Sequence, residues 1–456
     1  MITLHFDSEE NLYQQIYSYF VREIRQNRLR AGDKLPARRA LAQHLGVSIN
    51  TVKQAYEQLT DEGYIISRER SGYYVDKLSP EDLPKIPKRR TPFVAPKTIK
   101  AKYNFNYSSI DYSRMPISIL KKCGQEAMES CLLESRGPKG GIWTLREEIG
   151  KYLENRRGVI ASVENIIITS GYSEHLLILM SLIDQAYFAM EDPGYKKTQE
   201  IFKASSKEIV SIPIDQYGFS VRDLEKTRAN VAIVTPNHQF PTGIIMGMRR
   251  RQRLLNWAGQ GEERYIVEDD YDSDFKYTGK PIPALKSLDK EDRVILSGSF
   301  SQSIGPFLGI SYLVLPDSLR KKWEQIDLPL SGASLLQQYT LEKFLFSGAF
   351  EKHINRMNTL YRKKRNLLLR KIKNEKEIEI LGAEAGLHFI LRLKEGYWDI
   401  KDLQRKMKKN RIYLAEISHY SINEWPYRDL IIGFGGIPLH ELEVAIDLLL
   451  EIIRKK

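Results

Sequence analysis

Apolar residues in the first quarter of the chain recur with helical spacing, which predicts three short helices that each bury one face. The three apolar stripes are Leu12, Ile16, Phe20 and Ile24; then Leu41, Ala42 and Leu45; then Val52, Ala55, Tyr56 and Leu59. Gly46 closes the second stripe, Ser48 is a good N-cap for the third, and Gly63 ends it. Two short strands, 64–67 and 73–75, follow around a Ser-Gly turn. Helix, turn, helix and hairpin is the order of a winged helix-turn-helix.

A recognition helix presents one polar face to the DNA major groove while its apolar face packs on the domain. The third predicted helix has this division, and backbone amides at its start can also hold phosphate. The residues predicted to contact DNA are Arg38, Arg39, Ser48, Asn50, Thr51, Lys53, Arg68 and Arg70. The alternative is a small helical domain used for protein contacts, which the near-neutral charge of this module would also allow.

After residue 102 the pattern changes to short β-branched runs that alternate with helical stretches. The runs are 166–169, 187–190, 231–235, 265–267, 294–296 and 312–315. Such alternation predicts an α/β domain with a mostly parallel sheet, and the helix-rich stretch from about residue 337 predicts a smaller α+β lobe. The predicted organisation is therefore a DNA-binding domain at 10–76, a linker at 77–102 and an α/β domain at 103–456.

The predicted linker contains five prolines and eight basic residues against two acidic ones. Repeated proline forbids a regular helix or a central strand, so an extended, basic spacer is expected. Its charges would either only keep it solvated or add a contact to phosphate.

Composition narrows the class of protein further. The chain has 456 residues, two cysteines and a net charge of +12. So few cysteines exclude a disulfide framework and favour the cytoplasm. Neither a signal peptide nor a membrane span is expected. The positive charge allows a polyanionic partner but is weak evidence for one.

The N-terminal motifs resemble the GntR-type DNA-binding domain. Residues 34–42 read KLPARRALA and residues 45–52 read LGVSINTV, and the resemblance covers roughly residues 10–76. It implies phosphate and base contacts from Arg39, Thr51, Lys53 and the wing. Many members have arginine where this chain has Ile49, so we expect either a shifted base preference or an affinity lower by one contact, worth about 1–3 kcal/mol.

From about residue 103 onward, five strings resemble fold-type I aminotransferases, and in particular the MocR-type branch of the GntR family. The strings are GPKGG at 137–141, TSGYS at 169–173, EDPGY at 191–195, TPNHQFPTG at 235–243 and EDDYD at 268–272. The resemblance implies a pyridoxal phosphate pocket. Asp269 would hold the protonated pyridine nitrogen, Tyr271 would contact the ring hydroxyl, and Tyr195 would lie beside the ring. The residues implied around the phosphate are Gly171, Tyr172, Ser173, Ser299 and Ser301.

Two departures from that family change the expected chemistry. The family has Ser-Lys where this chain has Ser301-Gln302, and an amide cannot form the Schiff base with the cofactor. The family also has an arginine for the phosphate where this chain has Gly309. Standard transamination is therefore not expected. The predicted ligand is pyridoxal phosphate, an amino-acid adduct of it or an unrelated effector, held non-covalently and not as an internal aldimine. Lys197 and Arg428 are further candidates for contact with a ligand carboxylate.

The sequence thus predicts a cytoplasmic transcription regulator that binds operator DNA, senses a small effector and uses no metal. The MocR resemblance further implies a head-to-tail homodimer. One alternative is a pyridoxal phosphate-dependent aminotransferase with a fused DNA-binding head. Another is an aminotransferase-like domain that only dimerises and binds no ligand.

Overall fold

A computed structural model of the chain describes residues 11–77, 101–132, 137–277, 282–328, 332–394 and 400–454, together with Leu4, Phe6 and Leu330. The chain divides into two compact units, residues 1–97 and 98–456. Almost all of the predicted linker at 77–102 lies outside the described residues, so its predicted conformation remains a prediction.

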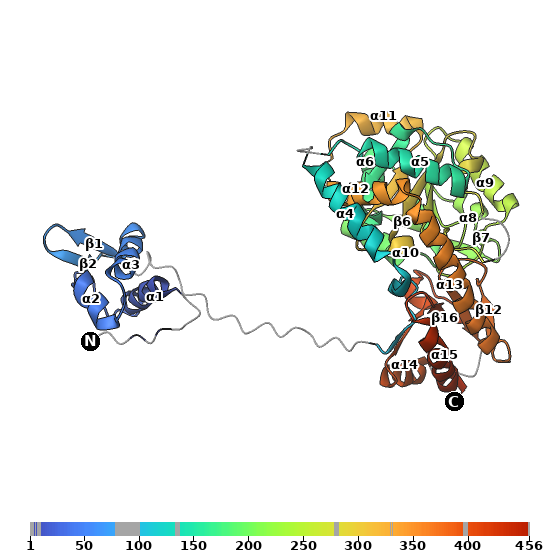
Figure 1. The fold of residues 1–456 in the computed structure, drawn as a ribbon. Coiled ribbons are helices and arrows are strands. Elements are labelled where there is room, and N and C mark those ends of the chain that lie inside the picture. The colour runs from blue at the N-terminus through green and yellow to red at the C-terminus, as the bar shows by residue number, and fades with distance from the viewer. Residues whose placement is uncertain are drawn as a thin grey trace. The chain divides into compact units, whose positions relative to one another are not determined.

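The smaller unit has the element order that the sequence predicts (Figure 1). Its elements are α1 (Leu12–Arg25), α2 (Arg38–Leu45), α3 (Ile49–Asp61), β1 (Ile65–Arg68) and β2 (Gly72–Val75). The two strands pair antiparallel, with Ile65 opposite Val75. Phe20 and Tyr56 meet edge to face with ring centroids 5.6 Å apart in the core between α1 and α3. Leu12 differs from the prediction: it is 41% exposed, and Val21 joins the core instead.

The larger unit is built on an eight-stranded sheet in the order β4-β11-β10-β9-β8-β5-β6-β7. Its strands are β4 (Ile166–Thr169), β5 (Phe188–Asp192), β6 (Ile209–Asp215), β7 (Gly218–Phe219), β8 (Val231–Val234), β9 (Tyr265–Asp270), β10 (Val294–Ser299) and β11 (Ser311–Val314). The run from β10 to β6 is parallel, while β11 is antiparallel to both its neighbours. The prediction of a mostly parallel sheet is confirmed.

Helices cover both faces of this sheet. They are α4 (Ile117–Cys131), α5 (Trp143–Arg157), α6 (Tyr172–Leu182), α7 (Lys196–Ala204), α8 (Val221–Leu224), α9 (Met248–Gly259), α10 (Ser301–Ile304), α11 (Asp317–Gln325) and α12 (Leu335–Phe346). Ile166 and Ile167 point to opposite faces of β4 and belong to different core clusters. Because both faces are covered, β4, β5, β8 and β11 are buried at every position and show no alternation of buried and exposed residues, whereas β6, near the edge, is only partly buried.

The predicted smaller lobe follows at the C-terminal end of the large domain (Figure 1). Its elements are α13 (Ala349–Ile372), β12 (Ile378–Leu381), β13 (His388–Leu393), α14 (Ile400–Lys409), β14 (Ile412–Tyr413), β15 (Ala415–Glu416), β16 (Arg428–Gly433) and α15 (Leu439–Arg454). Four strands form an antiparallel sheet in the order β12-β13-β16-β15, and β14 pairs with β3 (Tyr103–Asn104) from the start of the unit. No helix among the described residues is both long and apolar enough to cross a membrane.

Candidate functional site

The start of α3 is held in place by a side-chain cap. Ser48 Oγ accepts a hydrogen bond from the backbone N–H of Thr51 at 3.0 Å, as its predicted N-cap role requires. Asn50 on the first turn and Lys53 at the start of the second are exposed, and Lys53 Nζ lies 3.5 Å from Glu57 Oε1. The helix therefore presents polar donors and acceptors at a rigid end, which suits contacts to base edges.

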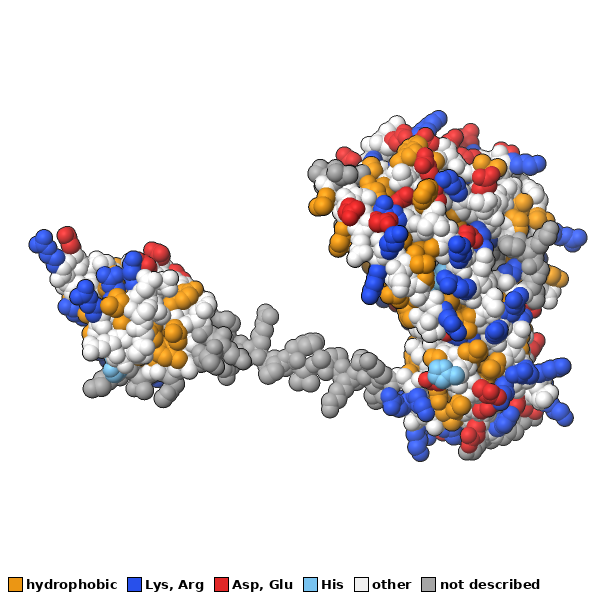
Figure 2. Space-filling model, viewed as in Figure 1, with side chains coloured by type: hydrophobic (Ala, Val, Ile, Leu, Met, Phe, Trp, Pro, Cys, Tyr) orange, Lys and Arg blue, Asp and Glu red, His pale blue; other side chains and the backbone are white. Residues whose placement is uncertain are grey.

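Basic side chains of the wing and of α2 lie against tyrosines of β2. The Arg68 guanidinium lies 4.6 Å from the centre of the Tyr74 ring, and that of Arg38 lies 5.6 Å from Tyr73. Figure 2 shows Lys and Arg side chains gathered over the part of this unit that carries β1 and β2. Arg39 and Arg70 are also exposed. Stacking on an aromatic ring orders a long basic side chain while leaving its charge available to phosphate.

A cavity of about 420 Å³ lies in the larger unit, at the ends of β4, β9 and β10. In α/β folds ligands bind at the carboxyl ends of parallel strands. Eight predicted ligand-contact residues line the cavity: Gly171, Tyr172, Tyr195, Asp269, Tyr271, Ser299, Ser301 and Gln302. Ser173 is not among the lining residues, because successive residues of a helix point about 100° apart.

Aromatic rings form a wall of the cavity. Phe240 lies 5.8 Å from Tyr195 and 4.6 Å from Tyr107, measured between ring centroids, and Tyr172 lies 5.5 Å from Tyr195. The sequence gives no local signal for Tyr107, which reaches the cavity from a loop more than sixty residues before Tyr172. This wall suits a flat or cationic ligand.

Asp269, the second residue of the EDDYD string, lines the cavity. Asp270 is paired bidentately with Arg157, with both N–O distances 2.8 Å, and Asp272 pairs with His238. No hydrogen bond or ion pair to the Asp269 side chain is found within the part of the chain that the structure describes. Burial, followed by repulsion from neighbouring carboxylates, raises the pKa of Asp269 to about 8. Asp269 therefore lacks the positive partner that Asp270 and Asp272 have.

His175 also lines the cavity, although no motif in the sequence predicts it as a site residue. Its Nε2 lies 2.6 Å from Thr169 Oγ1 and its Nδ1 lies 2.9 Å from Ser297 Oγ. Burial lowers the pKa of His175 to about 3, so the ring is neutral near pH 7. It supplies no positive charge to the cavity.

The structure places the two departures from the aminotransferase pattern at this same cavity. Gln302 and Gly309 both line it, and Gln302 Oε1 is a buried acceptor for which the described part of the chain offers no hydrogen-bond donor. Gly309 has a φ of 54°, in the left-handed region that favours glycine, and a Cβ added there would meet no atom closer than 3.7 Å. Lys197 lines the cavity as an exposed residue. Arg428 is exposed at the start of β16 and is not a lining residue, so the structure does not place this candidate at the site.

The turn after β4, which the resemblance assigns to a phosphate group, already holds a carboxylate. Glu174 Oε2 accepts hydrogen bonds from the backbone N–H and the hydroxyl of Ser170, at 2.6 and 2.7 Å. Its other oxygen accepts from the N–H of Gly332 at 3.1 Å. The ring-facing part of the cavity, with Asp269, fits a pyridoxal group. The positions for a covalent link and for a phosphate do not fit it.

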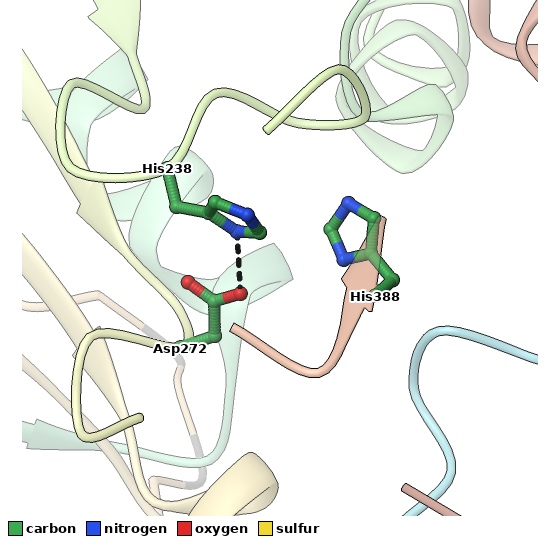
Figure 3. A group of neighbouring side chains, drawn as sticks. All are labelled: His238, Asp272 and His388. Carbon is green, nitrogen blue, oxygen red and sulfur yellow. Dashed lines mark hydrogen bonds and ion pairs between the residues drawn. The ribbon is translucent and has the colours of Figure 1, made fainter. Parts of the chain in front are cut away.

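A buried group beside the cavity connects the smaller lobe to the large domain. Figure 3 shows His238 and Asp272 facing each other with His388 nearby, and their ligand atoms lie within 4.8 Å of one another. His238 Nδ1 lies 2.8 Å from Asp272, and its Nε2 lies 3.2 Å from the Gly382 carbonyl. Burial opposes the charged form of His238, but Asp272 more than offsets this and raises its pKa. Both His238 nitrogens therefore have protein partners, and the group acts as a connection between β12, β13 and the 235–243 loop.

Comparison with known proteins finds a matching family for each of the two units. Residues 12–75 match the model for bacterial regulatory proteins of the gntR family, and residues 105–447 match that for aminotransferase class I and II. An uncharacterized HTH-type transcriptional regulator of Bacillus subtilis, YdeL, is 36% identical over 446 residues, covering 95% of each chain. The probable rhizopine catabolism regulatory protein MocR of Rhizobium meliloti is 29% identical, covering 96% of this chain and 92% of its own. A solved archaeal alanine:glyoxylate aminotransferase is 25% identical with a TM-score of 0.71, covering 79% of this chain and 92% of its own.

Proposed function

This chain belongs to the gntR family of bacterial regulatory proteins and carries an aminotransferase class I and II domain as its second unit; from that membership we propose that it is a transcription regulator whose aminotransferase-like domain senses a small effector. The fold of the second unit is one associated with pyridoxal phosphate. Binding to the bacterial chromosome would place the protein in the cytoplasm.

One combination of features carries this proposal. A capped helix exposes Asn50 and Lys53 in one unit, and in the other a cavity retains Asp269 but has an amide, Gln302, where a Schiff base would need an amine. The first feature supports reading of DNA, and the second supports binding without group transfer. We therefore assign no enzymatic activity to the chain and no metal.

The proposed mode of action is allosteric. Two chains would associate head to tail through the aminotransferase-like domain and present two DNA-binding units to half-sites roughly 34 Å apart, or a multiple of that distance. An effector in the cavity would change the relative stability of two arrangements of the dimer. A coupling of about 1–3 kcal/mol, or roughly 5–150-fold in DNA affinity, would be enough for regulation.

The test is fluorescence anisotropy of the full chain with DNA from upstream of its own gene, measured over a series of salt concentrations. We expect a sequence-selective, salt-sensitive complex. Lys53→Ala should weaken it and lower the slope of log affinity against log salt by about one. Lys290→Ala removes the same charge from an exposed site of the larger unit and should change neither. Equal affinity for operator and unrelated DNA, or equal effects of the two variants, would contradict the proposal.

The second candidate function is an aminotransferase with a fused DNA-binding head, which the match of residues 105–447 favours. It predicts absorbance from a Schiff base after addition of pyridoxal phosphate and turnover of an amino acid. Our proposal predicts neither, because residue 302 is glutamine.

A further inference from the structure

The 420 Å³ cavity has a carboxyl group on its inner wall with no cation beside it among the described residues. Asp269 is the acidic lining residue, and burial and the neighbouring carboxylates raise its pKa to about 8, so a cation in the cavity would favour its ionised form. Lys197 is the basic lining residue, and it is exposed to solvent. Glu191 is buried behind the cavity, and its Oε1 has no hydrogen-bond partner within the described ranges of the chain. A buried carboxylate without a cation costs several kcal/mol, so the cavity is best completed by a ligand with a positive charge.

The hydrogen-bonding groups inside the cavity also favour a positively charged ligand. Gln302 Oε1 is a buried acceptor that receives no hydrogen bond from any described residue. Ser299 and Ser301 lie beside it, with their hydroxyls 3.0 Å apart. A protonated amine has up to three N–H donors and no acceptor, which matches a carboxylate, an amide oxygen and hydroxyl oxygens.

The turn that could receive an anion is occupied. The amide and the hydroxyl of Ser170 both donate to Glu174, so these donors at the start of α6 are already bonded to a resident negative charge. A phosphate placed there would lose these donors and meet a carboxylate, and no arginine lines the cavity within the described residues.

We propose that this cavity binds a ring-sized organic amine in its protonated form, without a phosphate group, with the ammonium or ring N–H held by Asp269. The proposal rests on the proposed function, since it names the class of effector. Tyr195, Phe240 and Tyr172 form the wall against which the ring or the cation packs. The volume of about 420 Å³ lies near the lower end of the roughly 300–1,000 Å³ found for small-molecule sites, which suits a compact ligand.

The test is isothermal titration calorimetry of the full chain with three probes: pyridoxamine, its 5′-phosphate and benzylamine. We expect pyridoxamine to bind at least tenfold more tightly than its phosphate ester. Asp269→Asn should weaken pyridoxamine at least tenfold, whereas Asp327→Asn, at a fully exposed site, should have no effect. Tighter binding of the phosphate ester would overturn the proposal. So would the absence of Asp269-dependent binding of both pyridoxamine and benzylamine.

A gain-of-function variant guards against simple loss of folding. Glu174→Gln combined with Gly309→Arg removes the resident charge and adds a cation at a position where a Cβ would meet no atom closer than 3.7 Å. The φ of 54° strains any residue other than glycine there, by about 1–2 kcal/mol, so the single variant Gly309→Ala serves as the control for this strain. This variant should reverse the preference in favour of pyridoxamine 5′-phosphate by tenfold or more, with a circular dichroism spectrum like that of the wild type. An unchanged preference would contradict the account of why phosphate is excluded.

DNA binding measured on the same samples separates the two proposals. If the chain binds its operator but none of the amines, the proposed regulatory function stands and the proposed class of effector is wrong. If the chain binds pyridoxamine through Asp269 but forms no selective DNA complex, the proposed ligand site stands and the proposed regulatory function is wrong.

Discussion

Replacing Asp269 with asparagine should stabilise the ligand-free larger unit, and increasingly so as the pH rises. Asparagine keeps the size and the hydrogen-bonding capacity of the side chain but removes the negative charge. The pKa of Asp269 is raised from its ordinary value of 3.8 to about 8 by burial and then by the neighbouring Asp270, Glu191 and Asp272. Ionisation of this carboxyl group therefore opposes folding when no cation occupies the cavity.

The size of the effect follows from proton linkage. Between pH 4 and pH 8 the folded state holds a proton on Asp269 that the unfolded state has lost, so the free energy of unfolding falls as the pH rises. One proton corresponds to about 1.4 kcal/mol per pH unit. From pH 5 to pH 7 the wild type should therefore lose about 2–3 kcal/mol relative to Asp269→Asn. Protonation of Asp269 contributes its full stabilisation of the wild type below the pKa of the unfolded state, 3.8, and none above the pKa of the folded state, about 8.

Urea unfolding followed by tryptophan fluorescence measures this difference directly. All five tryptophans lie after residue 142, so the signal reports on the larger unit alone. The exposed-site control Asp327→Asn should follow the wild-type profile. Parallel pH profiles for the wild type and Asp269→Asn would refute the reasoning, because they would mean that Asp269 is already paired or solvated.

Three further changes test other parts of the structure. Ser48→Ala removes the cap on the Thr51 amide and should destabilise the smaller unit by about 1 kcal/mol, measured by circular dichroism on thermal unfolding. Arg157→Met leaves Asp270 buried without its partner and should cost the larger unit about 3–5 kcal/mol in urea unfolding, more than Asp270→Asn with Arg157→Met combined. Gln302→Lys restores an amine and should give borohydride-sensitive absorbance with pyridoxal phosphate but little turnover; absence of a covalent adduct would argue against the assignment of this position.

Local patterns determined most of the fold of this chain. The stripes in α1, α2 and α3, the cap at Ser48 and the apolar runs of the large sheet depend on neighbours in sequence, since burial of one face imposes a helical or strand period. The absence of an amine at position 302 is likewise visible in the sequence alone, because an amide is not a nucleophile in any fold.

Tertiary structure alone decided which polar groups remain without a partner. The string EDDYD contains three aspartates, and only packing shows that Arg157 pairs with Asp270 and His238 with Asp272, while Asp269 faces the cavity. These pairs join residues 113 and 34 positions apart. The hydrogen bonds from Ser170 to Glu174 join residues that are close in sequence. Their effect on ligand binding, however, depends on the cavity at the ends of the strands. The hydrophobic pattern of a helix or strand can be read from one segment of the sequence, whereas an ion pair depends on which segments the fold brings together.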